Sequence, residues 1–325
     1  MFIPVIIDNM RKNLQIIKDT VRAMGGTIEE FLPERGCFYV NVLGKRILLE
    51  GDISITRQSF VSRQLTRCKD ITHKLLVAHG LPTPETRYFY NKSYDRLNVA
   101  KQLRSLHYPI IIKDATGSNS RGIFPFIKDA GEAMAVIRQE LPNYRSMIAQ
   151  TMVFGREYRL LVLGERVIAA LEMVPPYVRG DGRSSVRKLI QKKQKTTAQR
   201  TALDKKLTQI LHDQGAALDS IISAGRVVYI KKNCCLAEGG ETRDVTDRVH
   251  KNVGKICVSA SKIVGKQLAG IDVICRDIAK APMAKSFNIL EINGKPDLYM
   301  HHHPTSGKSQ NVVKKVIEFM ARAAN

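Results

Sequence analysis

Two short segments near the C-terminal end constrain this chain more than any other feature. Residues 270–274 (GIDVI) and 288–293 (NILEIN) alternate β-branched or apolar side chains with single polar ones. That pattern is typical of short strands that are buried in a sheet. The sequence therefore predicts two buried strands that carry isolated acidic and amide side chains.

Three of these polar side chains are candidate metal ligands. Successive strand residues point to opposite faces, so Glu291 and Asn293 are expected on one face while Leu290 and Ile292 enter the core. If Asp272 lies on the neighbouring strand, three oxygen donors converge at the end of a sheet, which suits Mg²⁺ or the similar Mn²⁺. An ordinary polar strand face has the same E-x-N pattern, so these segments alone leave both interpretations open.

The bulk composition favours a globular protein of several domains. A chain of 325 residues with 44% hydrophobic residues is long enough for two or three domains with real cores. No stretch of about 18 uncharged apolar residues occurs, and the N-terminal stretch lacks the charged leader of a signal peptide. The six cysteines show neither a disulfide framework nor CxxC metal spacing. We therefore expect free thiols in a cytoplasmic protein.

The chain is strongly basic. It contains 52 Lys and Arg against 30 Asp and Glu, a formal net charge of +22. Part of the excess is concentrated at residues 183–206, where nine basic residues accompany one acid, Asp204. Such an excess indicates a polyanionic partner and leaves three classes open: phosphate, an acidic peptide or a nucleic acid. A solvated helix face is the alternative explanation of the basic run.

The pattern of expected elements divides the chain into three parts. Residues 1–66 combine a helix at 10–24, ended by Gly25-Gly26, with strand-like pieces at 37–42 and 46–49, and we predict a small α/β lead-in domain there. We find no catalytic constellation in it. The other two parts, each mixing strands and helices, are predicted at residues 67–146 and at 147–325, with a basic insert at 183–215.

A loop rich in Gly, Ser and Asn lies in the second part. Residues 116–122 connect a β-branched run that ends in Lys113 to a strand at 123–127. Such a loop can turn its backbone N–H groups toward a phosphate, and Arg121 would add charge. An ordinary hairpin loop is the alternative, so this segment does not decide the function by itself.

Several motifs then follow in one order along the chain. They are P-x-V-x-G-D-G-R at 176–183, G-G at 239–240, D-V-T-D-x-V-H at 244–250, A-G-I-D-V at 269–273 and M-H-x-H-P at 300–304. This order resembles the ATP-grasp superfamily and, more specifically, the ATP-grasp region of cyanophycin synthetases and of bifunctional glutathione synthetases. The resemblance extends from about Lys69 to the C-terminus. It implies an ATP-grasp fold of mixed α+β and α/β character, in which two α+β subdomains clasp ATP, preceded by the small lead-in domain.

The resemblance also implies an ATP site. Two lysines would hold the phosphates as point charges, and the Gly/Ser loop would add further contacts. The end of a strand would present backbone groups to adenine, and a glutamate would accept hydrogen bonds from the ribose hydroxyls. In that order the residues are Lys69, Lys113, Ser118, Arg121, Gln150, Thr151, Met152 and Glu157.

The resemblance further implies residues that act at the reaction centre. Asp272, Glu291 and Asn293 match the Mg²⁺ ligands, which strengthens the interpretation of the two strands as a metal site. An arginine and a lysine would contact the phosphate or an acyl-phosphate intermediate, and two glycines would let the backbone approach that intermediate closely. These residues are Arg159, Lys231, Gly239 and Gly240.

The implied activity is an ATP- and Mg²⁺-dependent carboxylate–amine ligase that acts on an amino acid or a small peptide through an acyl phosphate. The basic segment at 183–206 is a candidate for a lid over the site, and it is also a candidate for drawing in an acidic substrate. Gln150, Met173 and Cys235 depart from the residues usual in the resembled group. These departures leave the carboxylate donor and the amine acceptor open. The resembled group commonly forms dimers, so a homodimer is one expected assembly.

Two other functions fit parts of the sequence. One is a basic protein associated with nucleic acid that keeps an ATP-grasp-like fold, although 6% aromatic residues and no Trp argue against a base-stacking surface. The other is a catalytically silent ATP-grasp partner subunit. A silent site has no need of all three ligands Asp272, Glu291 and Asn293, so we prefer the ligase.

Overall fold

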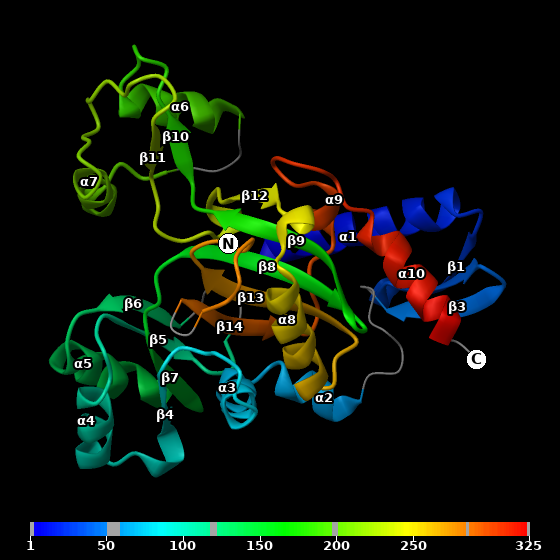
Figure 1. The fold of residues 1–325 in the computed structure, drawn as a ribbon, viewed down its shortest axis with the longest axis horizontal. Helices are drawn as coiled ribbons and strands as arrows, with labels where there is room; N and C mark the ends of the chain where they lie inside the picture. Colours follow the sequence, from blue (N-terminus) through cyan, green and yellow to red (C-terminus); the bar gives the residue numbers. More distant parts are fainter. Residues whose placement is uncertain (1–2, 51–58, 118–121, 197–200, 284–285, 324–325) are drawn as a thin grey trace.

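A five-stranded antiparallel sheet lies at the centre of the structure, a computed structural model that describes residues 3–50, 59–117, 122–196, 201–283 and 286–323. Its strand order is β12-β9-β8-β13-β14 (Figure 1). The strands are β8 (Arg156–Leu163), β9 (Arg166–Val174), β12 (Glu241–Asp244), β13 (Leu268–Cys275) and β14 (Phe287–Asn293). Most of their side chains are buried, because other elements cover both faces of the sheet.

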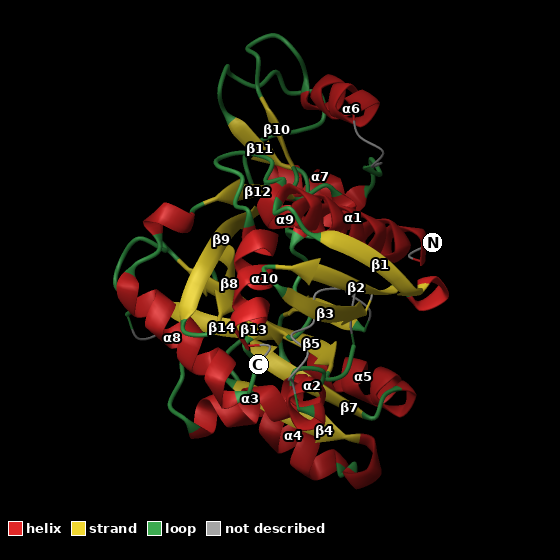
Figure 2. Ribbon diagram, turned by 90° about the vertical axis from the view of Figure 1, so that its right-hand side faces the viewer, coloured by secondary structure: helices red, strands yellow, loops and turns green. Residues whose placement is uncertain are grey.

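One face of this sheet is covered by helix α8 (Lys251–Ile263), and part of the other by the N-terminal elements (Figure 2). Helix α8 packs its apolar side chains on β8, β9 and β13. On the opposite face, Leu161, Ala169 and Leu268 join a core with the N-terminal elements and α10 (Val312–Ala323). The end of that face near Arg159 and Asp272 is left to the candidate site.

The N-terminal elements are a helix and a three-stranded sheet of order β1-β2-β3. They are α1 (Ile3–Ala23), β1 (Thr27–Leu32), β2 (Cys37–Val42) and β3 (Lys45–Glu50). The predicted helix and the two predicted strands are present, but β1 was missed because most of its side chains are exposed and leave no apolar alternation. The N-terminal sheet buries its inner face in a cluster shared with α10 and the central sheet. The boundary of the lead-in domain stays a prediction.

A second subdomain contains a four-stranded sheet of order β4-β7-β5-β6 with its own core. Two helices that begin with aspartate caps, Asp95 and Asp129, pack against this sheet. Helices α2 and α3 connect the subdomain to the N-terminal elements. The elements are α2 (Phe60–Leu65), α3 (Lys69–Ala78), β4 (Thr86–Tyr90), α4 (Arg96–Arg104), β5 (Ile110–Asp114), β6 (Ile123–Ile127), α5 (Ala130–Glu140) and β7 (Ser146–Thr151).

The basic segment belongs to a small lobe that projects from the central sheet (Figure 1). The lobe consists of β10 (Tyr177–Arg179), α6 (Val186–Thr196), α7 (Lys205–His212) and β11 (Val227–Tyr229), and its apolar side chains form a separate cluster. An ion pair of 2.7 Å between Lys193 Nζ and Glu241 Oε1 ties α6 to β12. The role of this lobe as a lid stays a prediction.

Short helical segments complete the fold. One of them, α9 (Tyr299–His302), lies between the central sheet and the N-terminal elements. The 3₁₀ turns are Pro33–Arg35, Asn91–Ser93, Leu141–Asn143, Leu236–Glu238 and Thr246–Arg248. All six cysteines are free thiols, as expected. Within the part of the chain that the structure describes, we find no helix with the length and apolarity needed to cross a membrane.

One expectation about β14 was wrong. Leu290 was predicted to enter the core, but a bulge shifts the register between β13 and β14, so that Asp272 pairs with Glu291 while the next residue, Val273, pairs with Ile289. The extra residue, Leu290, therefore leaves the simple alternation and is half-buried at a pocket. Ile292 is buried as predicted.

The shared core predicts that α1 contributes to the stability of the whole fold. Ile17, which is 1% exposed, packs in the cluster that α1 shares with α10 and the central sheet. We expect Ile17→Ala to lower the free energy of unfolding by about 2–4 kcal/mol, measured by urea denaturation. Val77→Ala, on an exposed position of α3, should change it by less than about 0.5 kcal/mol. Equal effects of the two substitutions would contradict the shared core.

Candidate active site

The pairing of β13 with β14 brings the three candidate metal ligands together. Asp272 and Glu291 are direct partners across the two strands. The side-chain amide of Asn293 donates to Asp272 Oδ2 at 2.9 Å. The proximity that the sequence interpretation required is therefore present, whereas the role of the three residues as ligands stays a prediction.

Arg159 holds the same carboxylate from the other neighbouring strand. It lies opposite Asp272 in the pairing of β8 with β13, and its Nε and Nη2 atoms donate to Oδ1 and Oδ2 at 2.6 and 2.8 Å. This two-bond geometry fixes both side chains. Burial opposes the charge on Arg159, but the adjacent Asp272 outweighs burial and raises the pKa of the guanidinium above its usual value. The arginine therefore remains a cation at the centre of the site.

Lys69 reaches the carboxylates from the facing subdomain. It is the first residue of α3, and its backbone N–H donates to Ala115 O at 2.7 Å. Its Nζ donates to Gly117 O and lies 3.4 Å from Glu291 Oε1. The lysine thus bridges the start of the predicted phosphate loop and a predicted metal ligand.

Lys113 is the second predicted phosphate lysine. It lies near the end of β5 and is half-buried. Burial lowers its pKa to about 8, while the carboxylate of Glu291 acts in the opposite direction and Lys69 adds to the lowering. The site therefore contains a lysine whose charge changes close to neutral pH. Ser118 and Arg121, the other predicted phosphate contacts, lie outside the described residues.

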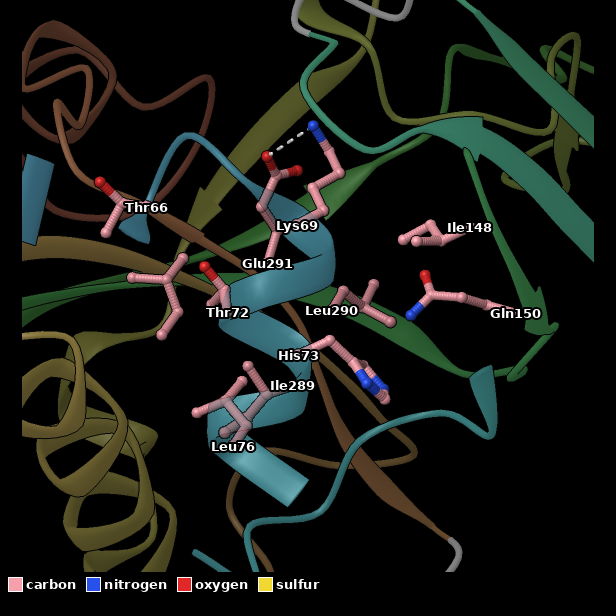
Figure 3. A pocket seen from close by; sticks show the side chains of 11 residues that line it. Thr66, Lys69, Thr72, His73, Leu76, Ile148, Gln150, Ile289, Leu290 and Glu291 are labelled. Atoms are coloured by element: carbon pink, nitrogen blue, oxygen red, sulfur yellow. Dashed lines mark ion pairs between the residues drawn. The ribbon is translucent and has the colours of Figure 1, made fainter. Parts of the chain in front are cut away.

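A pocket opens where α3, β7 and β14 meet (Figure 3). Lys69 and Glu291 lie near the beginning of α3, and Leu290, Ile148 and Gln150 lie beside the helix. The pocket is narrow and has charged groups at one end and the apolar side chains of Ile148 and Leu290 next to Gln150.

A buried hydrogen-bond network that sequence reasoning missed lies at this pocket. Gln150 Nε2 donates to Thr86 Oγ1 at 2.9 Å, Thr86 Oγ1 lies 2.9 Å from His73 Nε2, and His73 Nδ1 lies 2.7 Å from Tyr88 Oη. Burial lowers the pKa of His73, so the imidazole is neutral at pH 7. The network uses an N–H of the Gln150 side-chain amide and so fixes the orientation of that side chain. No local pattern marks His73 or Thr86 in the sequence.

Two backbone N–H groups after Gln150 already donate hydrogen bonds within the protein. The N–H of Thr151 donates to Glu85 O and the N–H of Met152 donates to Pro109 O, both at 2.9 Å. Adenine binding at this edge, as predicted, would therefore use carbonyl groups or exchange one of these two bonds.

Glu157, the predicted ribose contact, lies on β8 near the metal-ligand residues. Burial raises the pKa of its carboxyl to about 7, and the negative charge of Asp272 adds to the rise while Arg159 opposes it. The thiol of Cys234 interacts with Glu157 and also donates to Met173 O at 3.2 Å. Cys234 is a contact that sequence reasoning missed, since a lone cysteine carries no positional signal.

The two predicted loop glycines have a backbone reason for being glycine. Gly239 has φ of +98°, a conformation that disfavours other residues. A Cβ on Gly240 would lie 2.5 Å from Cys234 O. Just before them, Glu238 Oε2 lies 3.0 Å from Lys231 Nζ, so the predicted phosphate lysine is held beside this loop by an ion pair.

The donor set fits Mg²⁺. Two carboxylates and an amide oxygen are hard ligands, and Mg²⁺ commonly combines one or two carboxylates with substrate phosphates and waters. Arg159, Lys69 and Lys113 surround the carboxylates with positive charge. Over the described ranges, no group of three or more His, Cys, Asp or Glu side chains is arranged to hold a metal, and the histidines at 301–303 form no such group.

Comparison with known proteins agrees with this geometry. Residues 66–237, more than half of the chain, match the RimK-like ATP-grasp domain. This chain belongs to the RimK-like ATP-grasp family. The ATP-grasp fold and the family membership that the sequence motifs implied are thereby confirmed.

Sequence relatives of the ATP-grasp chain include ligases with longer chains. Cyanophycin synthetase of Nostoc sp. is 31% identical over 261 residues, which cover 78% of this chain and 29% of that protein. The bifunctional glutathione biosynthesis protein of Pasteurella multocida is 27% identical over 329 residues, covering 96% of this chain and 43% of that protein. The chain thus spans less than half the length of either relative.

A solved structure shows the same fold. The crystal structure of a bifunctional glutathione synthetase from Pasteurella multocida superposes with a TM-score of 0.71 at 22% sequence identity. The match covers 96% of this ATP-grasp chain and 44% of the other chain. Its coverage includes the N-terminal elements, so they too belong to the shared architecture.

Nucleotide binding should weaken as the pH rises through about 8. A bound phosphate favours the charged form of Lys113, whose pKa is about 8 in the free protein. Affinity for ADP, measured by calorimetry, should therefore fall by up to about tenfold per pH unit as the pH rises above about 8. Lys113→Met should lower the affinity and remove this dependence, whereas Lys92→Met, at an exposed position, should not. A dependence that survives in Lys113→Met would contradict the assignment.

Proposed function

We propose that this ATP-grasp protein is an ATP- and Mg²⁺-dependent carboxylate–amine ligase that forms an amide bond through an acyl phosphate. The observation that carries the proposal is the convergence of Asp272, Glu291 and Asn293 beside Arg159 and two lysines. This arrangement supplies both a cation site and the positive charge that a transferring phosphoryl group requires. The family of amide-forming relatives supports the same reaction class.

The chemistry places few covalent demands on the protein. A carboxylate reacts poorly with an amine because its leaving group is poor. Transfer of the terminal phosphoryl group of ATP to a carboxylate oxygen gives an acyl phosphate, whose leaving group is phosphate. The amine then attacks the acyl carbon, phosphate leaves, and the amine loses a proton. The protein must align the carboxylate with the phosphoryl group and stabilise the charge of the transition state.

Each residue of the site has a part in that task. Lys69 and Lys113 would hold the ATP phosphates, and Arg159, already a fixed cation, would stabilise charge on the transferring group. Asp272, Glu291 and Asn293 would hold Mg²⁺, which would supply positive charge to the phosphates. Gly239 and Gly240 would let the backbone approach the acyl phosphate closely, and their N–H groups, which donate to Leu236 O and Cys235 O in this structure, would exchange those bonds for phosphate oxygens.

The substrate class that we propose is an amino acid or a small peptide. Cyanophycin synthetase and the glutathione biosynthesis protein are named for products built from amino acids. The basic lobe beside the site, with Lys188, Lys192 and Lys195 exposed on α6, favours an acidic substrate by steering. We place the reaction in the cytoplasm, where ATP is available and the six free thiols stay reduced.

A hydroxylamine trap would test the proposal. The purified protein is incubated with ATP, Mg²⁺ and single amino acids or dipeptides, with phosphate release and hydroxamate formation as the two measurements. One acid should give hydroxamate, because hydroxylamine captures its acyl phosphate. Glu291→Ala should lower that rate by at least about 100-fold while the fold, followed by circular dichroism, is retained.

A matched control separates the site from general damage. Glu165 is an exposed glutamate that pairs with Lys262 at 2.5 Å, away from Asp272 and its partners, and Glu165→Ala should keep wild-type turnover. Turnover retained by Glu291→Ala would refute the metal assignment. Phosphate release without hydroxamate for any acid would refute the acyl-phosphate step.

A further inference from the structure

We propose that Asn13, on the N-terminal helix, is a positioning residue of the active site. Its side chain fixes the segment that follows the metal-ligand strand, residues 294–302, and through that segment the geometry around Asp272. The inference rests on the proposed function, since it treats Asp272 and Asn293 as metal ligands. It assigns to the lead-in region a part in catalysis that its sequence does not suggest.

The segment after β14 is held first by close packing. A Cβ on Gly294 would collide with Thr66 Oγ1 and lie 2.9 Å from Lys266 Cε, so the backbone there is pressed against its neighbours. Two residues on, Pro296 packs on β13, where a Cβ on Gly270 would lie 3.2 Å from Pro296 Cβ. The path of the chain just beyond Asn293 therefore has little freedom.

Asn13 then holds the segment by three hydrogen bonds. Its Nδ2 donates to Asp297 Oδ1 at 3.1 Å, and its Oδ1 accepts from the N–H groups of Leu298 and Tyr299 at 3.1 and 2.9 Å. Asn13 is 7% exposed, so these bonds are shielded from water. An asparagine can donate and accept at once, which an alanine or a leucine at this position cannot do.

The held segment leads back to the reaction centre. The N–H of Tyr299, the first residue of α9, is one of the bonded groups. The next residue, Met300, is buried and its Sδ lies 3.9 Å from Arg159 Nη1. Arg159 in turn holds both oxygens of Asp272, while Asn293 at the start of the segment donates to the same carboxylate. Both ends of the segment therefore converge on one predicted metal ligand.

Loss of the Asn13 contacts should weaken metal binding and leave the binding of nucleotide without metal unchanged. Outer residues that orient metal ligands affect metal affinity although they do not touch the ion. The predicted nucleotide contacts Lys69 and Lys113 lie on the facing subdomain, and among the described residues no hydrogen bond joins them to residues 294–302. The affected quantity is thus the factor by which a divalent cation strengthens nucleotide binding.

The experiment measures ADP affinity of the full chain by calorimetry with saturating Mn²⁺ and again with EDTA. Asn13→Ala should reduce the strengthening by Mn²⁺ about fivefold or more and leave the affinity in EDTA unchanged. Gln15→Ala is the matched control, because Gln15 lies on the same helix and makes one exposed bond to Asp19. It should behave as the wild type.

A pair of exchanged side chains keeps the test decisive if Asn13→Ala does not fold. Asn13→Asp retains the two backbone contacts but sets a carboxylate against that of Asp297, so it should lose Mn²⁺ strengthening. Adding Asp297→Asn places an amide donor opposite the new carboxylate at position 13. The double variant should therefore regain the strengthening of ADP binding by Mn²⁺. Wild-type strengthening in Asn13→Ala, or no recovery in the double variant, would overturn the inference. A wild-type protein whose ADP binding does not respond to Mn²⁺ would instead overturn the proposed metal site itself.

Discussion

The site depends on one carboxylate, Asp272, which is held from both sides by neighbouring strands. Arg159 on β8 donates two hydrogen bonds to it, and Asn293 on β14 donates a third. Taking a carboxylate and a guanidinium out of water is costly unless their hydrogen-bonding groups are satisfied in good geometry. The two hydrogen bonds from Arg159 and the one from the Asn293 amide meet that condition. The site therefore requires the strand order β8-β13-β14, which places these residues side by side.

The charged side chains around this carboxylate include more cations than anions, which suits the phosphates of a nucleotide. Glu291 and Asp272 supply negative charge, and Lys69, Lys113 and Arg159 supply positive charge. Burial holds the pKa of Lys113 at about 8 and that of Glu157 at about 7, so both groups are close to a change of charge at neutral pH. The phosphates of a nucleotide carry more negative charge than one divalent cation neutralises, so the complex of the two would bring a net negative charge to these cations. Joint binding would therefore leave less uncompensated charge in the site than binding of the nucleotide alone.

The N-terminal elements are built into this architecture rather than attached to it. Their inner sheet face, α1 and α10 share one apolar cluster with the central sheet. Asn13 extends the same contact as a polar one, because it reaches the segment between β14 and α9. Apolar packing holds α1 against the core but is not directional. The hydrogen bonds of Asn13 have a fixed geometry and therefore specify how α1 is oriented there.

Local sequence patterns determined most of the elements of this fold. Apolar patterns and Gly signals predicted a helix that overlaps α1 and strands that match β2, β3 and β6 within a few residues. Motif order predicted the ATP-grasp fold, which the family match confirmed. The grouping of Asp272, Glu291 and Asn293 was also predictable, because it needs only strand alternation and one pairing. These features are local in the chain, and nearby residues suffice to specify them.

Tertiary structure alone decided the rest. The exposed strand β1 has no apolar alternation, and the bulge at Leu290 depends on how β13 and β14 pair. The network of His73, Thr86 and Gln150 joins residues that are up to 77 positions apart, and Asn13 meets Leu298 across 285 positions. Such contacts exist only once the core has placed distant segments side by side, so no local pattern records them. The sequence by itself determined the chemistry that the site can carry, and packing decided which distant residues hold it in place.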